Sequence, residues 1–276
     1  SIGAHYTGAC MGMPHALGAI DARRALLIMA PLALLGAALA SHGVERTVAT
    51  RLTGHRLGVA SEVVVIAVAF ALTSAYNRLK VPTSTIQILV FSLIGTALAT
   101  QAGVRWSKIG VLAILWVVAP LAACILGFAL THAFDRLAGG FQRSTNRAAA
   151  SARRGAGRLG LMLVLVGAVA SFAMGGNDVA NAAGPVVGAK VLSPVTAGTL
   201  GGVGLALGVL TYGRPLLSRV AFEIVHVDRT MATAAQAVQG GVVLATVAFG
   251  LFTSMNQALV GAMAGTGLAR GRQTCL

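Results

Sequence analysis

IGVLAILWVVAPLAACILGFALT, residues 109–131, is an unbroken run without a single charged side chain. A helix of about 20 apolar residues is long enough to cross the hydrocarbon core of a bilayer. The rest of the chain has the same character, since 56% of its 276 residues are hydrophobic and 10% are charged, against about a quarter charged in soluble proteins. The sequence therefore predicts an integral membrane protein.

Further long apolar stretches lie on both sides of this run, at about 25–41, 59–77, 85–102, 159–175, 195–212, 231–251 and 254–269. Backbone groups that face lipid must be hydrogen-bonded within their own segment, and the period-two alternation of a barrel strand is absent. We therefore expect an all-α fold, a polytopic transmembrane helix bundle.

The net charge of +14 raises the question of nucleic-acid binding. The basic residues, however, lie in short connections between apolar stretches, without interleaved aromatic residues. If each stretch crosses once, fifteen of the 21 Lys and Arg residues fall on one side and six on the other, which assigns the first side to the cytoplasm. Re-entrant hairpins would change this count.

The second half of the chain repeats the first. An offset of 172 pairs Gly3 with Gly175 and Gly36 with Gly208, and an offset of 170 pairs PTSTIQILV, from Pro82, with FTSMNQALV, from Phe252. Five crossings separate equivalent points, so we expect two inverted repeats, with broken or re-entrant helices. Secondary transporters are often built this way, with the substrate site near the midplane where the halves meet.

The repeat also divides the chain. We expect a first membrane repeat with a linking helix at 1–134, a basic cytoplasmic linker at 135–158 and a second membrane repeat at 159–276. An apolar run, 159–174, leads into the second copy, whereas only Ser1 and Ile2 precede Gly3. We therefore expect an N-terminal truncation that removed one helix.

GGNDVANAAGPVVGAK, residues 175–190, interrupts an apolar stretch with glycines, amides, a carboxylate and a proline, so we expect backbone groups freed from a continuous helix. Asp178 is the acidic residue in the middle of such a segment, whereas Glu62 lies near a segment end, within reach of the interface. An ionised group at membrane depth normally faces a cavity, a partner or an ion. Helix capping or pairing within the bundle is the structural alternative for Asp178.

This segment resembles the signature of the inorganic phosphate transporter (PiT) family, approximately GANDVANAxG. PTSTIQ and FTSMNQ resemble the family's second repeated motif, approximately PVSTTHA, and residues 105–128 resemble the helix that follows its first copy. The resemblance covers nearly the whole chain except the central linker. It implies a symporter that moves inorganic phosphate with sodium ions or protons and needs no other cofactor.

The resemblance also implies the site. Asn177 and Asp178 would bind the cation. The substrate ligands would be Thr83, Ser84, Thr85, Asn181, Thr253, Ser254, Asn256 and Gln257, of which Gln257, like Gln87, takes the place of the family's histidine. Hydroxyl and amide donors, with the free amides of helix N-termini, can replace the hydration of an oxyanion without binding it as tightly as arginine would.

The chain departs from the family pattern in its first copy, where His5 and Tyr6 replace Asn and Asp, and Ala9 replaces the second Asn. His5 is a candidate proton site, because small environmental shifts move histidine titration across physiological pH; a packing role is the alternative. In the second PVSTTHA-like copy Phe252, Met255 and Asn256 replace proline and two threonines. Sulfate or another oxyanion therefore stays open beside phosphate.

We expect the chain to be a transporter in a bacterial plasma membrane and not an enzyme, because no Ser–His pair, paired carboxylates or metal-spaced histidines point to catalysis. Its expected partners are the oxyanion and the lipid bilayer, without nucleic acid; a homodimer is open. A non-transporting, degenerate membrane subunit is the rival hypothesis.

Overall fold

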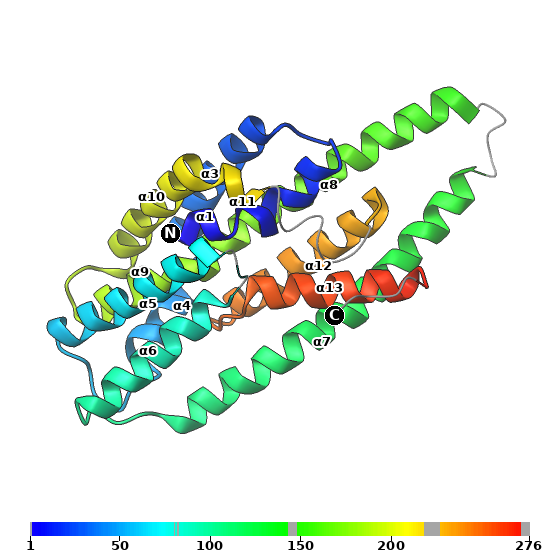
Figure 1. Ribbon diagram of the computed structural model, residues 1–276. Helices are drawn as coiled ribbons and strands as arrows, with labels where there is room; N and C mark the ends of the chain where they lie inside the picture. The colour runs from blue at the N-terminus through cyan, green and yellow to red at the C-terminus, as the bar shows by residue number, and fades with distance from the viewer. Residues whose placement is uncertain (1, 80, 82, 143–147, 218–226, 272–276) are drawn as a thin grey trace.

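The computed structural model describes the chain except residues 1, 80, 82, 143–147, 218–226 and 272–276. Helices account for nearly all of the described chain (Figure 1). They are α1 (Ile2–His5), the π-helix η1 (Gly8–Gly12), α2 (Met13–Ala16), α3 (Ala22–Ala40), α4 (His42–Thr50), α5 (Val59–Leu79), α6 (Thr85–Ala99), α7 (Trp106–Gln142), α8 (Ala148–Asp178), α9 (Ala180–Gly188), α10 (Pro194–Tyr212), α11 (Arg214–Leu217), α12 (Arg229–Ala248) and α13 (Met255–Ala269). The expected all-α fold is confirmed.

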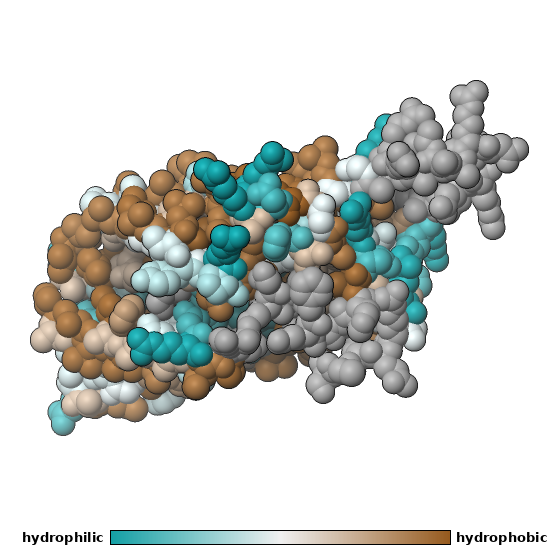
Figure 2. All heavy atoms as spheres, turned by 45° about the horizontal axis from the view of Figure 1, so that its top comes forward, coloured by the Kyte–Doolittle hydropathy of each residue, from teal (hydrophilic) through white to brown (hydrophobic). Residues whose placement is uncertain are grey.

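Six helices among the described residues are long and apolar enough to cross a bilayer: Ala22–Ala40, Val59–Leu79, Trp106–Arg136, Gly157–Gly188, Pro194–Tyr212 and Arg229–Ala248. α6 and α13 have 15 residues each and are shorter than a full crossing. Apolar side chains cover much of the surface, as the brown atoms in Figure 2 show. The chain is therefore a multi-pass integral membrane protein, with fewer candidate spans than the eight apolar stretches suggested.

Two helical hairpins approach each other from opposite ends of the bundle (Figure 1). α5 and α6 form the first hairpin, and an isolated bridge between Thr53 and Val104 closes its base. α12 and α13 form the second, and Arg270 closes its base through ion pairs with Asp228 (3.5 Å) and with Asp135 on α7 (2.6 Å). Their turns, near residues 83–84 and 249–254, meet in the middle of the molecule.

Serines start the second helix of each hairpin. Ser84 Oγ accepts the amide of Gln87 (3.3 Å) and so caps α6, while Ser254 Oγ accepts the amide of Gln257 (3.4 Å) and caps α13. A hydroxyl at this position satisfies one of the amides that the first helical turn leaves free. Pro82, the first residue of the PTSTIQ motif, lies outside the described residues.

Glycines let the two halves pack closely and reciprocally. A Cβ atom at Gly3 would lie 2.1 Å from the carbonyl oxygen of Leu205 on α10, and one at Gly175 would lie 2.0 Å from that of Ala33 on α3. The offset of 172 that relates Gly3 to Gly175 also relates Ala33 to Leu205. The segment around Gly3 thus packs on the second half of the chain in the same way as the segment around Gly175 packs on the first half.

Two expectations need correction. The segment 175–190 leaves the helix only at Val179 and after Gly188, because α8 ends at Asp178 and α9 spans Ala180–Gly188; most of its glycines serve close packing. Glu62 does not reach an interface, since it is only 4% exposed. α7 and α8 extend into the expected linker, whose residues 143–147 lie outside the described part, so the domain division stays a prediction.

Candidate substrate and cation site

Asp178 lies at the end of α8, completely buried, between the turns of the two hairpins. Its Oδ1 accepts the hydroxyl of Thr85 (3.3 Å) and its Oδ2 accepts the side-chain amide of Asn177 (3.1 Å). Among the described residues no Arg, Lys or His nitrogen lies within 4.0 Å of this carboxylate. A buried carboxylate without a basic partner is a site that a small cation or a proton can complete.

The Thr85 hydroxyl connects Asp178 to the first half of the chain. It donates its one proton to Asp178, so its lone pairs must accept from the Tyr6 hydroxyl (2.8 Å) and from Asn181 Nδ2 (2.9 Å). All four side chains are buried. Thr85 therefore orients the carboxylate and has no proton left for an anion in this conformation.

Asn177 connects the same segment to the second hairpin. Its Nδ2 donates to Thr253 O (2.9 Å), and its Oδ1 accepts Thr253 N (3.2 Å). The segment around Asp178 thus holds the first hairpin through Asn181 and the second through Asn177. Both side-chain amides face the hairpin turns because they lie four residues apart and so share one side of the helical segment formed by α8 and α9.

Two hydroxyls near these contacts have no partner. Thr83 Oγ1 and Thr253 Oγ1 are buried and make no hydrogen bond within the described structure. Ser84 and Ser254 use their oxygens as acceptors to cap α6 and α13, which leaves their protons available. Unsatisfied buried hydroxyls are costly to a fold, so their presence suits a ligand that accepts from them.

His5 and Asn256 lie where the hairpin turns meet. His5 contacts Asn77 Oδ1 through Nδ1 and Thr83 O through Nε2 (3.1 Å). Asn256 Nδ2 donates to Thr83 O (2.9 Å) and lies 3.2 Å from His5 Nε2. These two residues therefore join the first hairpin to the second. Gln257 follows on α13, with its buried Oε1 unpartnered.

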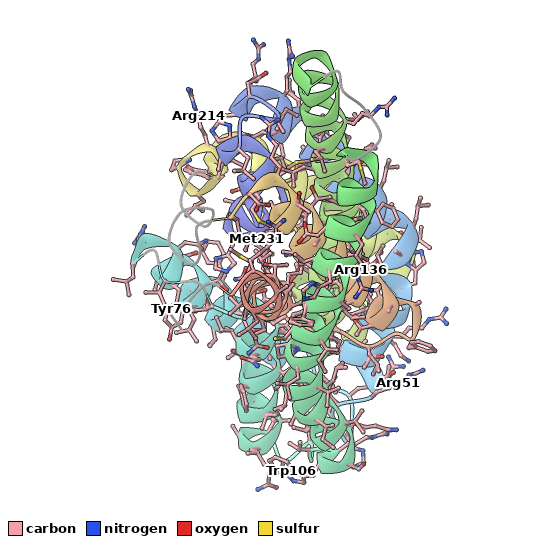
Figure 3. The ribbon with its side chains drawn as sticks, turned by 90° about the vertical axis from the view of Figure 1, so that its right-hand side faces the viewer. Arg51, Tyr76, Trp106, Arg136, Arg214 and Met231 are labelled. Atoms are coloured by element: carbon pink, nitrogen blue, oxygen red, sulfur yellow. The ribbon has the colours of Figure 1, made fainter. Side chains whose placement is uncertain are left out.

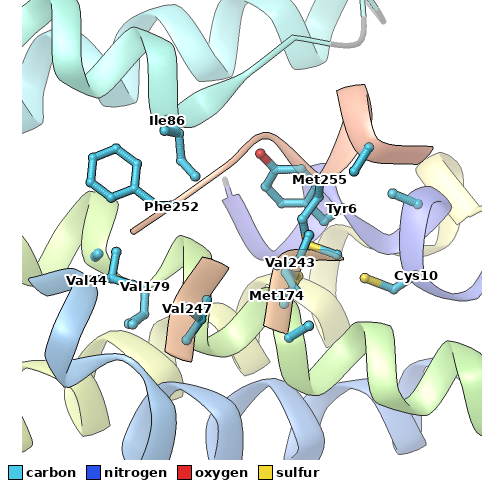
Figure 4. Close-up of a cluster of buried hydrophobic side chains, with 14 of the residues drawn as sticks. Tyr6, Cys10, Val44, Ile86, Met174, Val179, Val243, Val247, Phe252 and Met255 are labelled. Atoms are coloured by element: carbon cyan, nitrogen blue, oxygen red, sulfur yellow. The ribbon is translucent and has the colours of Figure 1, made fainter. Parts of the chain in front are cut away.

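An open groove of about 510 Å³ lies along the first hairpin, bordered by the exposed Leu72 and Phe91, and reaches the hairpin turn. Tyr76, Thr83, Ser84, Gln87 and Ser92 supply its polar lining. An apolar group that includes Tyr6, Ile86, Phe252 and Met255 packs beside the turns (Figure 4). Of the proposed anion ligands, Thr83 and Ser84 line this groove.

The charges around the site are unusual for an anion site. No Arg or Lys among the described residues is buried, and Figure 3 places Arg51 and Arg214 at the periphery. The N-termini of α6 and α13 lie at the meeting hairpin turns, where their free amides and helix dipoles favour an anion.

Sequence reasoning missed two features of this region. Tyr6 was considered only as a missing carboxylate, but its hydroxyl is part of the Asp178 network. Gln236 and Gln239 on α12 are also buried and hydrogen-bonded to each other (2.9 Å), and Gln236 donates to Ala9 O (2.7 Å). Two amides in the interior of a helix that is apolar enough to span a membrane were the available signal.

Known proteins resemble this chain in sequence and in fold. The sequence profile of the Phosphate transporter family matches residues 2–275. Sulfate permease CysP of Bacillus subtilis is 28% identical over 274 residues, which cover 98% of this chain and 74% of that protein. Inorganic phosphate transporter 2-1 of Arabidopsis thaliana is 34% identical over 128 residues, and a putative phosphate permease of Haemophilus influenzae is 34% identical over 125.

The last two alignments cover 42% and 40% of this chain, but only 22% and 29% of those proteins. A solved structure described as the sodium-dependent phosphate transporter has a TM-score of 0.84 and 21% identity, covering 98% of this chain and 86% of that one. The fold is therefore that of a known transporter. The profile match over nearly every residue establishes that this chain belongs to the phosphate transporter family, a family of membrane transporters and not of enzymes.

Proposed function

We propose that this protein is a secondary active transporter that moves an inorganic oxyanion together with a sodium ion or a proton. The observation that carries the proposal is the placement of Asp178 between two hairpin turns whose Thr83 and Thr253 hydroxyls have no partner among the described residues. The carboxylate would bind the cation, and the hydroxyls would bind the anion beside it.

The reciprocal glycine packing supports an arrangement of two inverted repeats around this site. The contacts of Gly3 with Leu205 and of Gly175 with Ala33 are the same contact with the halves exchanged. Such a relation lets one half rock against the other and expose a central site alternately to the two sides.

Coupling would arise from electrostatics. A bare carboxylate repels an oxyanion, whereas a cation on Asp178, held also by the oxygen of Asn177, attracts it. Each ligand then strengthens the binding of the other by the same factor. His5, between the two hairpins, stays a candidate proton site, although its contacts on both ring nitrogens also suit a purely structural link.

The anion is phosphate or sulfate. The family relationship favours phosphate, whereas the full-length likeness to a sulfate permease favours sulfate. The remaining proposed ligands, Ser84, Ser254, Asn256 and Gln257, offer hydroxyl and amide groups that suit both tetrahedral anions. Competition of labelled uptake by phosphate, sulfate and arsenate would identify the substrate.

Uptake of labelled phosphate or sulfate into proteoliposomes tests the proposal. We expect accumulation that depends on an inward sodium or proton gradient and is lost in Asp178→Asn. Asp21→Asn is the matched control, because Asp21 is exposed and asparagine keeps its capping bond to Arg24 N. Uptake by Asp178→Asn equal to that of the wild type would contradict the proposal, and no flux of any oxyanion would favour the non-transporting alternative.

A bacterial plasma membrane as location and a homodimer as assembly belong to the same proposal.

A further inference from the structure

Glu45 is a second fully buried acidic residue, and it lies outside the site around Asp178. It belongs to α4, a short helix that packs against α9 and α10 of the other half. Its Oε2 is buried and has no hydrogen-bond partner among the residues that the structure describes, and its Oε1 lies 2.5 Å from the hydroxyl oxygen of Ser41. Room for the carboxyl group comes from Gly198 on α10, since a Cβ atom there would lie 2.6 Å from Glu45 Oε1.

The hydrogen bonds of Ser41 indicate the protonation state of the Glu45 carboxyl group. Ser41 Oγ lies 2.5 Å from Ala37 O and 2.5 Å from Glu45 Oε1. A hydroxyl carries one proton, and a carbonyl oxygen can only accept. If the Ser41 proton goes to Ala37 O, the second proton must come from Glu45, so a protonated carboxyl group satisfies both contacts and a carboxylate satisfies only one.

The surroundings supply no charge that would stabilise the ionised form. Helices α8, α9, α10 and α12 pack against α4, and their titratable or charged groups, where described, are Arg158 and Asp178 on α8, Tyr212 on α10 and Arg229 on α12. α4 itself carries His42 and the exposed Arg46. No basic nitrogen among the described residues lies within 4.0 Å of the Glu45 carboxyl group. An isolated buried carboxylate is strongly disfavoured, which again indicates the neutral acid.

α4 is also connected to the second hairpin. Thr47, two residues after Glu45, donates to Gly250 O (2.6 Å). Gly250 has φ +65°, a conformation that favours glycine, and a Cβ atom at Gly43 would lie 3.0 Å from its Cα. Gly250 lies three residues before Thr253, a proposed anion ligand. Movement of this turn must therefore displace α4 or break its contacts.

We propose that Glu45 is a proton-binding site of the transport cycle, protonated in the conformation seen here and ionised when the second hairpin moves and water reaches α4. The ligand is a proton, bound as the neutral acid and released as the carboxylate forms. This inference rests on the proposed transport activity. It adds a coupling site that is separate from Asp178.

Glu62 offers the matched control. It is also buried, at 4% exposure, with its Oε2 unpartnered. It differs in that its Oε1 lies against Gly188, whose carbonyl oxygen accepts Arg56 Nη1 (3.5 Å), so a guanidinium is nearby. Glu62 also has no described link to the second hairpin, and we expect Glu62→Gln to keep coupling to protons.

The experiment compares wild type, Glu45→Gln and Glu62→Gln in proteoliposomes. Glutamine can donate to Ser41 as the protonated acid does, so it mimics a permanently occupied site. We expect Glu45→Gln to lose accumulation driven by a pH gradient while it keeps exchange of labelled for unlabelled anion, because exchange requires no release of the proton. The infrared band of a protonated carboxyl group at neutral pH should be weaker in Glu45→Gln than in wild type.

The outcomes separate the two proposals. Absence of exchange in wild type overturns the proposed transport function. The role of Glu45 alone is overturned if wild type exchanges anion normally while Glu45→Gln shows unchanged pH-driven accumulation and an unchanged carboxyl band. It is also overturned if pH coupling is lost in His5→Asn and not in Glu45→Gln. If Glu45→Gln does not fold, Ser41→Ala keeps the acid but removes its hydrogen-bond acceptor. It should shift the midpoint of the pH dependence toward acid, and an unshifted midpoint contradicts the proposal.

Discussion

Single hydroxyl groups determine how the buried carboxylate of Asp178 is oriented. Thr85 donates to it while accepting from Tyr6 and Asn181, so one side chain satisfies three buried partners. Thr83 and Thr253, by contrast, present hydroxyls that nothing in the described structure satisfies. The same residue type thus has two roles here: Thr85 orients the carboxylate, and the other two are available to a ligand.

Replacing Thr85 by valine should damage cation dependence. Valine removes the hydroxyl that donates to Asp178 and leaves the Tyr6 and Asn181 donors without an acceptor. Each unsatisfied buried group costs about 1–3 kcal/mol of free energy. We expect gradient-driven uptake by Thr85→Val to fall about tenfold or more, since 1.4 kcal/mol is a factor of ten. Thr85→Ser keeps the hydroxyl and should stay close to wild type; equal uptake by both variants would refute this role.

Replacing Thr253 by valine should weaken anion binding without destabilising the fold. The hydroxyl has no partner in the described part of the chain, so its removal leaves no group there newly unsatisfied. A hydrogen bond to a charged ligand is worth about 1.5–3 kcal/mol, which corresponds to roughly a 10- to 100-fold increase in the KM for the anion. Thr131→Val, which removes a hydroxyl bonded to Gly127 O of its own helix, is the control. An unchanged KM in Thr253→Val would exclude this hydroxyl as a ligand.

At the scale of whole elements, glycines decide which helices can touch. α13 packs on α7 so closely that a Cβ atom at Gly265 would lie 1.9 Å from the carbonyl oxygen of Cys124. Gly95 takes the equivalent place in the first repeat, yet a Cβ atom there would meet nothing within 4 Å. Equivalent positions in the two hairpins therefore differ in packing.

Gly265→Ala and Gly95→Ala form a matched pair. The first forces apart two backbones, and overpacking costs about 1–3 kcal/mol or more. The second adds a methyl group in open space, and alanine is about 1 kcal/mol better than glycine in a helix. We expect a clearly lower melting temperature for Gly265→Ala and an equal or higher one for Gly95→Ala, measured on the purified protein in detergent. Equal destabilisation by both would show that α7 and α13 do not pack as described.

At the scale of the molecule, transport requires the hairpin turns to separate. Thr83 and Asn256, from opposite hairpins, are in contact at the centre. Thr53 and Val104, at the base of the first hairpin, are held by a backbone bridge. Movement should change the first pair and leave the second pair unchanged.

Cysteine pairs test this movement in a background without Cys10, Cys124 and Cys275. Oxidation of Thr83→Cys with Asn256→Cys should stop the anion exchange that the reduced double variant retains. Reduction should restore exchange to that level, which we expect to lie below wild type because both residues are proposed anion ligands. The pair Thr53→Cys with Val104→Cys lies at a spacing that suits a disulfide and should leave exchange intact when oxidised. Exchange that continues across an oxidised central pair would contradict separation of the turns.

The sequence by itself determined the helical membrane fold, the transporter family and the importance of the segment around Asp178. Apolar length and local motifs carry that information because lipid dictates backbone pairing within each helix. It predicted broken or re-entrant helices but not that α6 and α13 are the short arms of hairpins, that glycines 175 and 176 stay helical, or that Tyr6 completes the Asp178 network. Those features depend on contacts between residues far apart in the chain, and Thr85 meets Asp178 across 93 positions only after the two halves pack together.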